Sequence, residues 1–256
     1  MGRRGALDVT DPWQALAEEI GRWTSPPLFW LRDDDATGPT PALATLLDTC
    51  AAHDVPVCLA AIPAALDPEF GPWLAQHAAN TIVVPHGYAH ANQAPGDEKK
   101  AEFGDHRPAA EMARELGEGL RRVQMGLGAR SRPIFVPPWN RLGSTAAAAL
   151  AQAGYTALSG KATRVTVTGI TVIDVHIDII DWRGTRGYGG DLPILGRLCD
   201  RLAALRSAGK EGEPTGILTH HAVHDPEAWG FLETLFERLG SQVRWLTVDD
   251  VISAVR

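Results

Sequence analysis

The sequence predicts an α/β fold built on a mostly parallel sheet, and two observations lead to this prediction. Short apolar runs typical of strands alternate with longer amphipathic segments typical of helices along the 256 residues. No internal repeat or low-complexity linker divides the chain. Strands that alternate with helices form parallel sheets with helices packed outside them. We therefore expect one domain spanning 1–256 that opens with a helix at about 11–23, its sheet being either open and doubly wound or closed into a barrel.

The individual elements follow from apolar runs, β-branched residues and capping signals. Thr40 stands before a proline and predicts the start of a helix, whereas TIVV at 81–84 is typical of a strand. Strands are expected at 28–32, 55–61, 81–84, 134–136 and 216–219, with one or two more in the stretch 165–180. Helices are expected at 11–23, 41–53, 70–79, 107–125, 144–153, 191–207 and 226–239, and the segments 243–246 and 248–255 close the chain.

Composition excludes several classes of protein. The formal net charge of −7 is spread along the chain, which argues against binding to a nucleic-acid backbone. No apolar run approaches the roughly 20 residues that span a bilayer, so we expect no membrane partner. Residues 1–11 contain no apolar core of a secretory signal, and the three cysteines are scattered. We therefore expect a cytoplasmic protein with buried, reduced cysteines; the oligomeric state stays open.

A run of three carboxylates follows the first apolar strand. Asp33, Asp34 and Asp35 come directly after LFWLR, and adjacent carboxylates repel one another unless a cation offsets their charge. In parallel α/β folds the carboxyl ends of strands are where ligands bind. The run is therefore a candidate cation site, and the alternative is a solvated acidic turn that caps the next helix.

Two histidines follow the strand TIVVP. His86 and His90 are four residues apart, and on a helix this spacing places both imidazoles on one face. Two neutral histidines and one carboxylate form a facial triad with open positions, which suits Zn²⁺ or Fe, Co or Ni. An HxxxH spacing is often incidental, but this one shares its position after a strand with the acidic run.

Three further signals lie at predicted strand ends. His220 and His221 follow the strand GIL, where a histidine could act as a general acid, and in an extended chain the two rings point to opposite sides. The segments 178–182 (DIIDW) and 135–141 (FVPPWNR) each offer an aromatic side chain that could line a cleft. A barrel gathers all such ends at one face, so together these signals indicate a single site.

In this order, the five motifs resemble those of the polysaccharide deacetylase family, also called the NodB-homology or carbohydrate esterase 4 family. The resemblance extends over about 28–221. It implies a distorted (β/α) barrel, commonly of seven strands. It also implies hydrolysis of an N-acetyl or O-acetyl group on a carbohydrate, with one divalent metal ion as cofactor, zinc first and Co, Ni, Fe or Mn as alternatives.

The resemblance also assigns roles to residues. Asp33 falls on the catalytic base and Asp34 on a metal ligand, together with His86 and His90. A register one residue later would give Asp34 as the base and Asp35 as the ligand. The general acid falls on His220, and the carboxylate that orients it falls on Asp181. The walls of the substrate cleft fall on Tyr88, Pro138, Trp139 and Trp182.

Two positions depart from the family pattern. Val136 stands where the family has an arginine that pairs with the catalytic base, and Gly87 stands where it has a Ser or Thr that supports the histidine loop. Arg32, Arg141 or Arg183 could supply the missing charge. Two alternative functions stay open: a metal-dependent amidase that acts on a non-sugar C–N bond, and a catalytically silent barrel that binds carbohydrate or metal.

Overall fold

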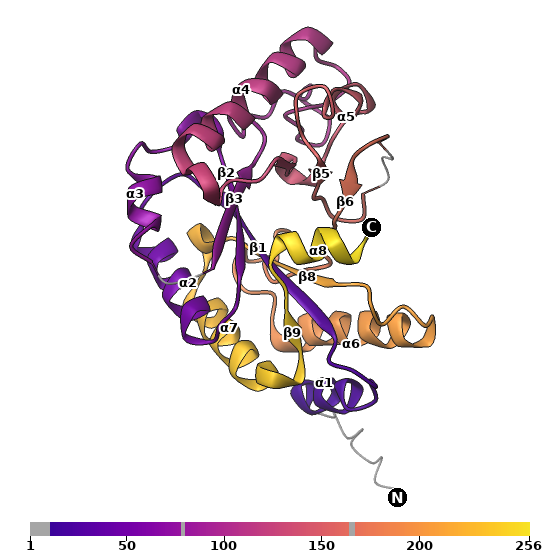
Figure 1. The fold of residues 1–256 in the computed structure, drawn as a ribbon. Coiled ribbons are helices and arrows are strands. Elements are labelled where there is room, and N and C mark those ends of the chain that lie inside the picture. The colour runs from indigo at the N-terminus through magenta and orange to yellow at the C-terminus, as the bar shows by residue number, and fades with distance from the viewer. Residues whose placement is uncertain (1–10, 78–79, 164–166) are drawn as a thin grey trace, which may run out of the picture.

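The computed structural model describes residues 11–77, 80–163 and 167–256, and its centre is a parallel sheet around strand β1 (Leu28–Ala36) (Figure 1). The strands follow the order β3 (Thr81–Pro85), β2 (Val57–Ala61), β1, β8 (Thr215–Thr219) and β7 (Ile177–Asp178). The short strand β9 (Arg244–Trp245) pairs with the beginning of β1. All of these pairings are parallel, as the alternation of strands and helices predicts.

A second parallel sheet continues the first around the molecule. It consists of β4 (Ile134–Phe135), β5 (Ala157–Leu158) and β6 (Thr171–Val172). Bridges between Val83 and Ser131 and between His86 and Val136 join β4 to β3. At the other edge the chain runs directly from β6 into β7, which pairs with β8. Among the described residues the neighbours therefore run from β1 through β2, β3, β4, β5, β6–β7 and β8 back to β1, as in a distorted barrel.

Helices cover the outside of this ring (Figure 1). They are α1 (Pro12–Ile20), α2 (Pro41–Ala52), α3 (Phe70–Leu74), α4 (Ala109–Leu127), α5 (Ser144–Ala149), α6 (Asp191–Ser207) and α7 (Pro226–Leu239). The last helix, α8 (Val248–Ala254), instead packs its buried Val248 and Val251 against Trp30 and other interior residues. Short 3-10 turns occur at Pro63–Ala65, Gly128–Arg130, Pro138–Asn140, His221–Val223 and Gly240–Gln242. No helix in the described part of the chain has both the length and the apolar character that crossing a bilayer would require.

Alternation along the strands divides the hydrophobic side chains into separate clusters. Phe29 and Leu31 of β1 pack under the outer helices, in one cluster with residues of α2, α6 and α7. Trp30 points the other way and packs with side chains from β2, β3, β4, β5 and β8 inside the ring. Because neighbouring residues of a strand face opposite sides, the polar residues that follow Leu31 are also sorted between interior and exterior.

Most expected elements agree with the structure within a few residues, and the main difference is the length of β1. The expected strand 28–32 continues through the three carboxylates to Ala36. The expected helix 70–79 ends at Leu74, and its last two residues lie outside the described part. The stretch 165–180 holds β6 and β7, and its first two residues lie outside the described part of the chain. Residues 1–10 also lie outside the described part.

His176, between β6 and β7, fastens the closing segment to β8. Its backbone N–H donates to the carbonyl of Gly216 at 2.7 Å, and its Nδ1 accepts the N–H of Gly216 at 2.9 Å. A Cβ at Gly216 would lie 2.6 Å from Trp30 Nε1, so only glycine fits here. Burial, followed by the charge of Arg201, lowers the pKa of His176 from 6.5 to about 3.

This lowered pKa predicts acid sensitivity of the fold. The unfolded chain protonates His176 below pH 6.5 and the native chain does not until about pH 3. The stabilisation is therefore complete above pH 6.5 and is lost as the pH falls toward 3. His176→Asn keeps an acceptor for the N–H of Gly216. Between pH 6.5 and 3 the free energy of unfolding of this variant should fall less steeply with decreasing pH than that of wild type. The two slopes should differ by up to about 1.4 kcal/mol per pH unit, which corresponds to one bound proton.

The measurement is urea denaturation of chelated protein at several pH values. His106→Asn, which changes an exposed histidine, is the control and should follow wild type. Identical slopes for wild type and His176→Asn would contradict the prediction.

Candidate active site

A cleft of about 420 Å³ opens where the carboxyl ends of the strands meet. The carboxyl end of β1 and the segments after β3, β4, β7 and β8 contribute to it, and every one of the five motifs supplies at least one lining residue. The lining residues are Asp34, Asp35, His86, His90, Lys100, Trp139, Asn140, Arg141, Asp178, Trp182, Arg186 and His220. Asp33 is not among them.

The register of β1 decides which carboxylates reach this cleft. Asp34 points to the interior, where it contacts Arg32, whereas Asp33 points outward to Thr219 and His221. Simple alternation would send Asp35 outward as well. However, the pairing of β1 with β2 shifts register between Asp33 and Ala36, and Asp35 has a φ of 74°. This irregularity turns Asp35 into the cleft, because a bulge re-aims the side chain that it carries.

Asp35, His86 and His90 form a group whose donor atoms converge. The Nε2 atoms of both histidines lie 3.3 Å from Asp35 Oδ1, and all three donor atoms are within 4.8 Å of one another. Ligands held about 2.1 Å from a tetrahedral ion would be about 3.4 Å apart, close to the observed separation. Asp35 Oδ1 is buried and has no hydrogen-bond partner among the described residues. The three ligand atoms and the unpartnered oxygen of Asp35 therefore fit a divalent ion. Asp35 takes the ligand position that the resemblance, in its first register, gave to Asp34.

The two histidines meet through a loop rather than on a helical face. Gly87 and His90 both have positive φ, 61° and 53°. A Cβ at Gly87 would lie 2.1 Å from the carboxylate of Glu102, which accepts the backbone N–H groups of Tyr88 and Ala89 at 3.1 and 2.7 Å. The buried Glu102 thus supports the loop, and glycine leaves room for it. This arrangement accounts for the absence of a Ser or Thr hydroxyl at position 87.

His86 is oriented by a hydrogen bond on its far side. Its Nδ1 lies 3.1 Å from the carbonyl oxygen of Val136, so an N–H there leaves the Nε2 lone pair toward Asp35. Such bonds to the second nitrogen fix the tautomer of metal-binding histidines. Burial disfavours protonation of His86, but the charges of Asp34 and Asp35 outweigh it and raise the pKa of this imidazole. The site therefore attracts positive charge, whether a proton or a metal ion.

Arg32 packs its guanidinium against Asp34. It is completely buried, and its Nε and Nη2 donate to the two oxygens of Asp34 at 2.8 and 2.9 Å. Its other N–H groups donate to the carbonyl and hydroxyl oxygens of Ser159 and to Asn140 Oδ1. All five guanidinium donors thus have acceptors. Val136 itself packs inside the ring.

His220 is the histidine of the His220–His221 pair that faces the cleft. Its Nε2 is 4.0 Å from Asp34 Oδ2, and its ring lies edge-on to Trp182 at 4.7 Å. Asp181 does not contact His220: its carboxylate accepts the backbone N–H groups of Arg183 and Gly184. The residue that does lie in the cleft is Asp178, which accepts Trp182 Nε1–H at 3.0 Å.

Asp33 and His221 form a buried pair behind the cleft. Asp33 accepts the hydroxyl of Thr219 at 2.7 Å and the backbone N–H of His221 at 2.8 Å, and its other oxygen contacts His221 Nδ1. Burial opposes ionisation of Asp33, but His221 outweighs it and lowers the pKa of the carboxyl. The pair fastens the end of β1 to the end of β8, which places Asp34 and His220 side by side on the opposite face.

The other expected cleft residues divide into two groups. Trp139 lines the cleft, and its ring packs against that of His90 with the centroids 4.5 Å apart and the planes tilted by 49°. Tyr88 instead packs beneath Arg122, whose guanidinium lies 5.6 Å from the phenol ring, and Pro138 is buried against Gly87. The structure therefore places Trp139 and Trp182 at the cleft and Tyr88 and Pro138 behind it.

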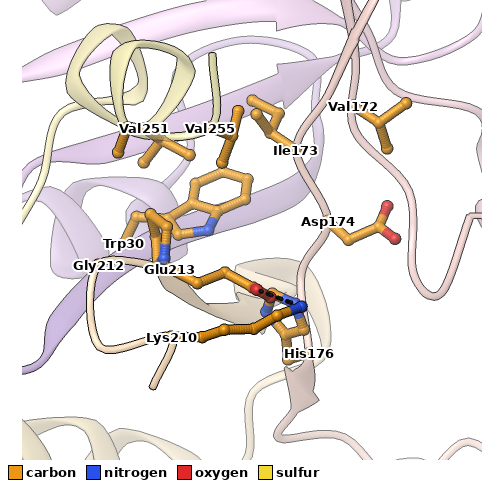
Figure 2. Close-up of a pocket in the computed structure, with 12 residues that line it drawn as sticks. Trp30, Val172, Ile173, Asp174, His176, Lys210, Gly212, Glu213, Val251 and Val255 are labelled. Carbon is orange, nitrogen blue, oxygen red and sulfur yellow. Dashed lines mark ion pairs between the residues drawn. The ribbon is translucent and has the colours of Figure 1, made fainter. Parts of the chain in front are cut away.

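A different cavity, of about 550 Å³, lies near the amino ends of the strands (Figure 2). It is bounded by Trp30, by Val251 and Val255 at α8, and by His176. Its polar groups have partners: Lys210 pairs with Glu213 at 3.7 Å, and His176 Nδ1 accepts a backbone N–H. The side-chain atoms of the described residues that converge without hydrogen-bond partners therefore lie in the cleft at the carboxyl ends of the strands, which favours that cleft as the functional site.

Comparison with solved structures identifies the fold. A candidate polysaccharide deacetylase from Mycobacterium smegmatis superposes with a TM-score of 0.64 at 14% identity, over 91% of this chain and 92% of that one. The chain has the polysaccharide-deacetylase fold. A family 4 carbohydrate esterase from Streptomyces lividans in complex with acetate matches with a TM-score of 0.54 at 16% identity, over 85% and 90% of the two chains. A family 4 acetyl xylan esterase from Clostridium thermocellum in complex with a cobalt ion matches at 0.53 and 14%, over 88% and 90%.

Sequence comparison alone does not detect the similarity to these deacetylase and esterase structures. No family model matches the chain, and no curated protein matches it at significance. This divergence agrees with the two departures from the motif pattern, at Gly87 and Val136. In a polysaccharide-deacetylase fold that has diverged this far, the site geometry is the better guide to function.

Proposed function

We propose that the protein is a metal-dependent hydrolase that removes an acetyl group from a carbohydrate, first an N-acetyl and second an O-acetyl group. The observation that carries this proposal is the meeting of Asp35, His86 and His90 beside an Asp34–His220 pair in one cleft. A cation site with open positions next to a general base and a general acid is the set of groups that hydrolysis of an acyl bond needs. The fold shared with deacetylases supports the same reading.

Asp35, His86 and His90 would hold the divalent ion, with zinc as the first choice for two imidazoles and one carboxylate. When bound, such an ion makes water more acidic and polarises a carbonyl oxygen. The described side chains leave space on the cleft side of the three donors, next to Trp139 and His220, which is where an acetyl group would enter.

Asp34 would act as the general base and His220 as the general acid. Asp34 takes a proton from the attacking water, the oxygen of that water forms a bond to the acetyl carbon, and the backbone N–H at Trp139 stabilises the oxyanion. Protonated His220 then gives its proton to the departing nitrogen or oxygen of the sugar. The bidentate pair with Arg32 fixes the orientation of the Asp34 carboxylate.

Arg32 also bears on the silent-barrel alternative. A silent protein was favoured by the valine at position 136, where the family has an arginine. The buried guanidinium of Arg32, which hydrogen-bonds Asp34 from β1, would take the role of that arginine. A general base at Asp34 that Arg32 holds in place favours a catalytic protein over a silent one.

The test is release of acetate by protein loaded with Zn²⁺, using N-acetylated sugars, O-acetylated sugars and simple acetamides as a panel. Wild type should release acetate from a sugar in the panel and should bind about one metal ion per chain. His220→Ala should keep the metal and lose about 10²- to 10⁴-fold in turnover, the range for removal of a general acid. Wild-type protein that binds metal but hydrolyses nothing in the panel would count against the proposal.

A further inference from the structure

The entrance of the cleft is cationic although the chain as a whole is acidic. Lys100, Arg141 and Arg186 come from three different segments and line the same cleft, in a protein whose net charge is −7. All three are exposed at its rim. Three cationic side chains at one rim offer the positive charge that an anionic group would bind.

The carboxylates of the cleft are directed to groups deeper in rather than to this rim. Asp34 pairs with Arg32, Asp178 lies 3.8 Å from Lys161, and Asp35 Oδ1 faces the Nε2 atoms of the two histidines at the proposed metal site. In contrast, no carboxylate within the described ranges forms an ion pair with Lys100, Arg141 or Arg186. A divalent ion at the floor would add further positive charge.

The rim is held in place by hydrogen bonds and ring contacts. Arg141 Nη1 donates to the carbonyl of Lys100 at 2.8 Å, and Lys100 Nζ lies 5.8 Å from the ring centroid of Trp139. Arg186 sits in a turn closed by its own N–H to the carbonyl of Asp181, while the Asp181 carboxylate accepts two further N–H groups of that turn. Asp181, expected to orient His220, therefore shapes the loop that presents Arg186.

We infer that the substrate is an acetylated sugar that carries an anionic group, a carboxylate or a phosphate, which the three rim cations bind while the acetyl group enters the floor. This inference rests on the proposed deacetylase function and narrows its substrate class. Arginine and lysine are the side chains that pair with carboxylate and phosphate oxygens. A neutral polysaccharide would leave all three charges without a partner.

The experiment compares matched probes on the zinc-loaded protein. They are N-acetylglucosamine, its 1-phosphate and 6-phosphate, and the corresponding uronic acid, each assayed for acetate release and, separately, for Kd by calorimetry. We expect at least one anionic probe to exceed the neutral sugar about tenfold to hundredfold in kcat/KM and in affinity, the usual strength of hydrogen bonds to a charged group. The phosphate and uronate arms distinguish the two sources of charge.

Variants locate the effect. Arg186→Ala and Lys100→Met, the latter keeping an unbranched side chain against Trp139, should each lower the ratio of anionic to neutral affinity about tenfold. Arg183→Ala removes a neighbouring exposed arginine that does not line the cleft and should leave the ratio unchanged.

The two proposals fail in different ways. Equal turnover and equal affinity for anionic and neutral probes would overturn the substrate class and leave the deacetylase in place. Selective binding of an anionic probe without acetate release from any probe would support the anion site while counting against deacetylation. A ratio that falls equally in Arg183→Ala and Arg186→Ala would also overturn the assignment, since the effect would then be the general charge of the loop.

Discussion

Replacing Asp35 with Asn should remove the metal, whereas replacing Asp34 with Asn should leave it bound. Asp35 is the carboxylate whose oxygen lies 3.3 Å from both histidine nitrogens, and Asp34 is engaged by Arg32 instead. Loss of a direct ligand should weaken zinc binding by at least about 100-fold, beyond the 10- to 100-fold that outer partners account for. Elemental analysis and competition with a chelator measure this difference.

Catalytic activity, compared with metal content, should also distinguish Asp34→Asn from Asp35→Asn. Asp34→Asn should retain near-stoichiometric zinc and lose about 10²- to 10⁴-fold in turnover, because an amide cannot accept the proton. Asp33→Asn is the matched control within the same run of aspartates: it lies outside the cleft and should keep the metal. If Asp34→Asn lost the metal while Asp35→Asn kept it, the earlier register, with Asp34 as ligand and Asp33 as base, would be right.

Replacing Arg32 with Met should destabilise the fold by about 3–5 kcal/mol, the cost of leaving a buried charge without its partner. Arg32 and Asp34 are both almost completely buried, so solvent cannot take the place of the guanidinium. The acceptors on Ser159 and Asn140 would lose their donors as well. Urea or guanidinium denaturation followed by circular dichroism measures the free energy of unfolding.

Two further variants sharpen this result. Arg132→Met removes an exposed pair with Asp249 and should cost about 1 kcal/mol or less. The double variant Arg32→Met/Asp34→Leu removes both buried charges and should recover at least half of the lost stability. A single Arg32→Met variant as stable as wild type would show that the pair is not needed to hold Asp34.

The sequence by itself determined the class of the fold and pointed to the cleft that holds the candidate site. Apolar strands alternating with helices predict a parallel α/β arrangement, and five motifs at strand ends predict one cleft at the carboxyl edge. His86 and His220 could be singled out because each follows a strand directly, and His90 because it lies four residues after His86. These predictions depend on local periodicity and on the direction of parallel strands, which a single sequence carries.

Only the tertiary structure decided which side chains meet. Three adjacent aspartates have the same chemistry, and the bulge at Asp35, visible as a positive φ, sends it to the histidines while Asp33 turns to His221. Arg32 reaches Asp34 only because β1 continues past its apolar run, and Glu102 reaches Gly87 from a loop fourteen residues away from Tyr88. Such contacts arise from long-range packing and strand register, so the local sequence pattern does not determine them.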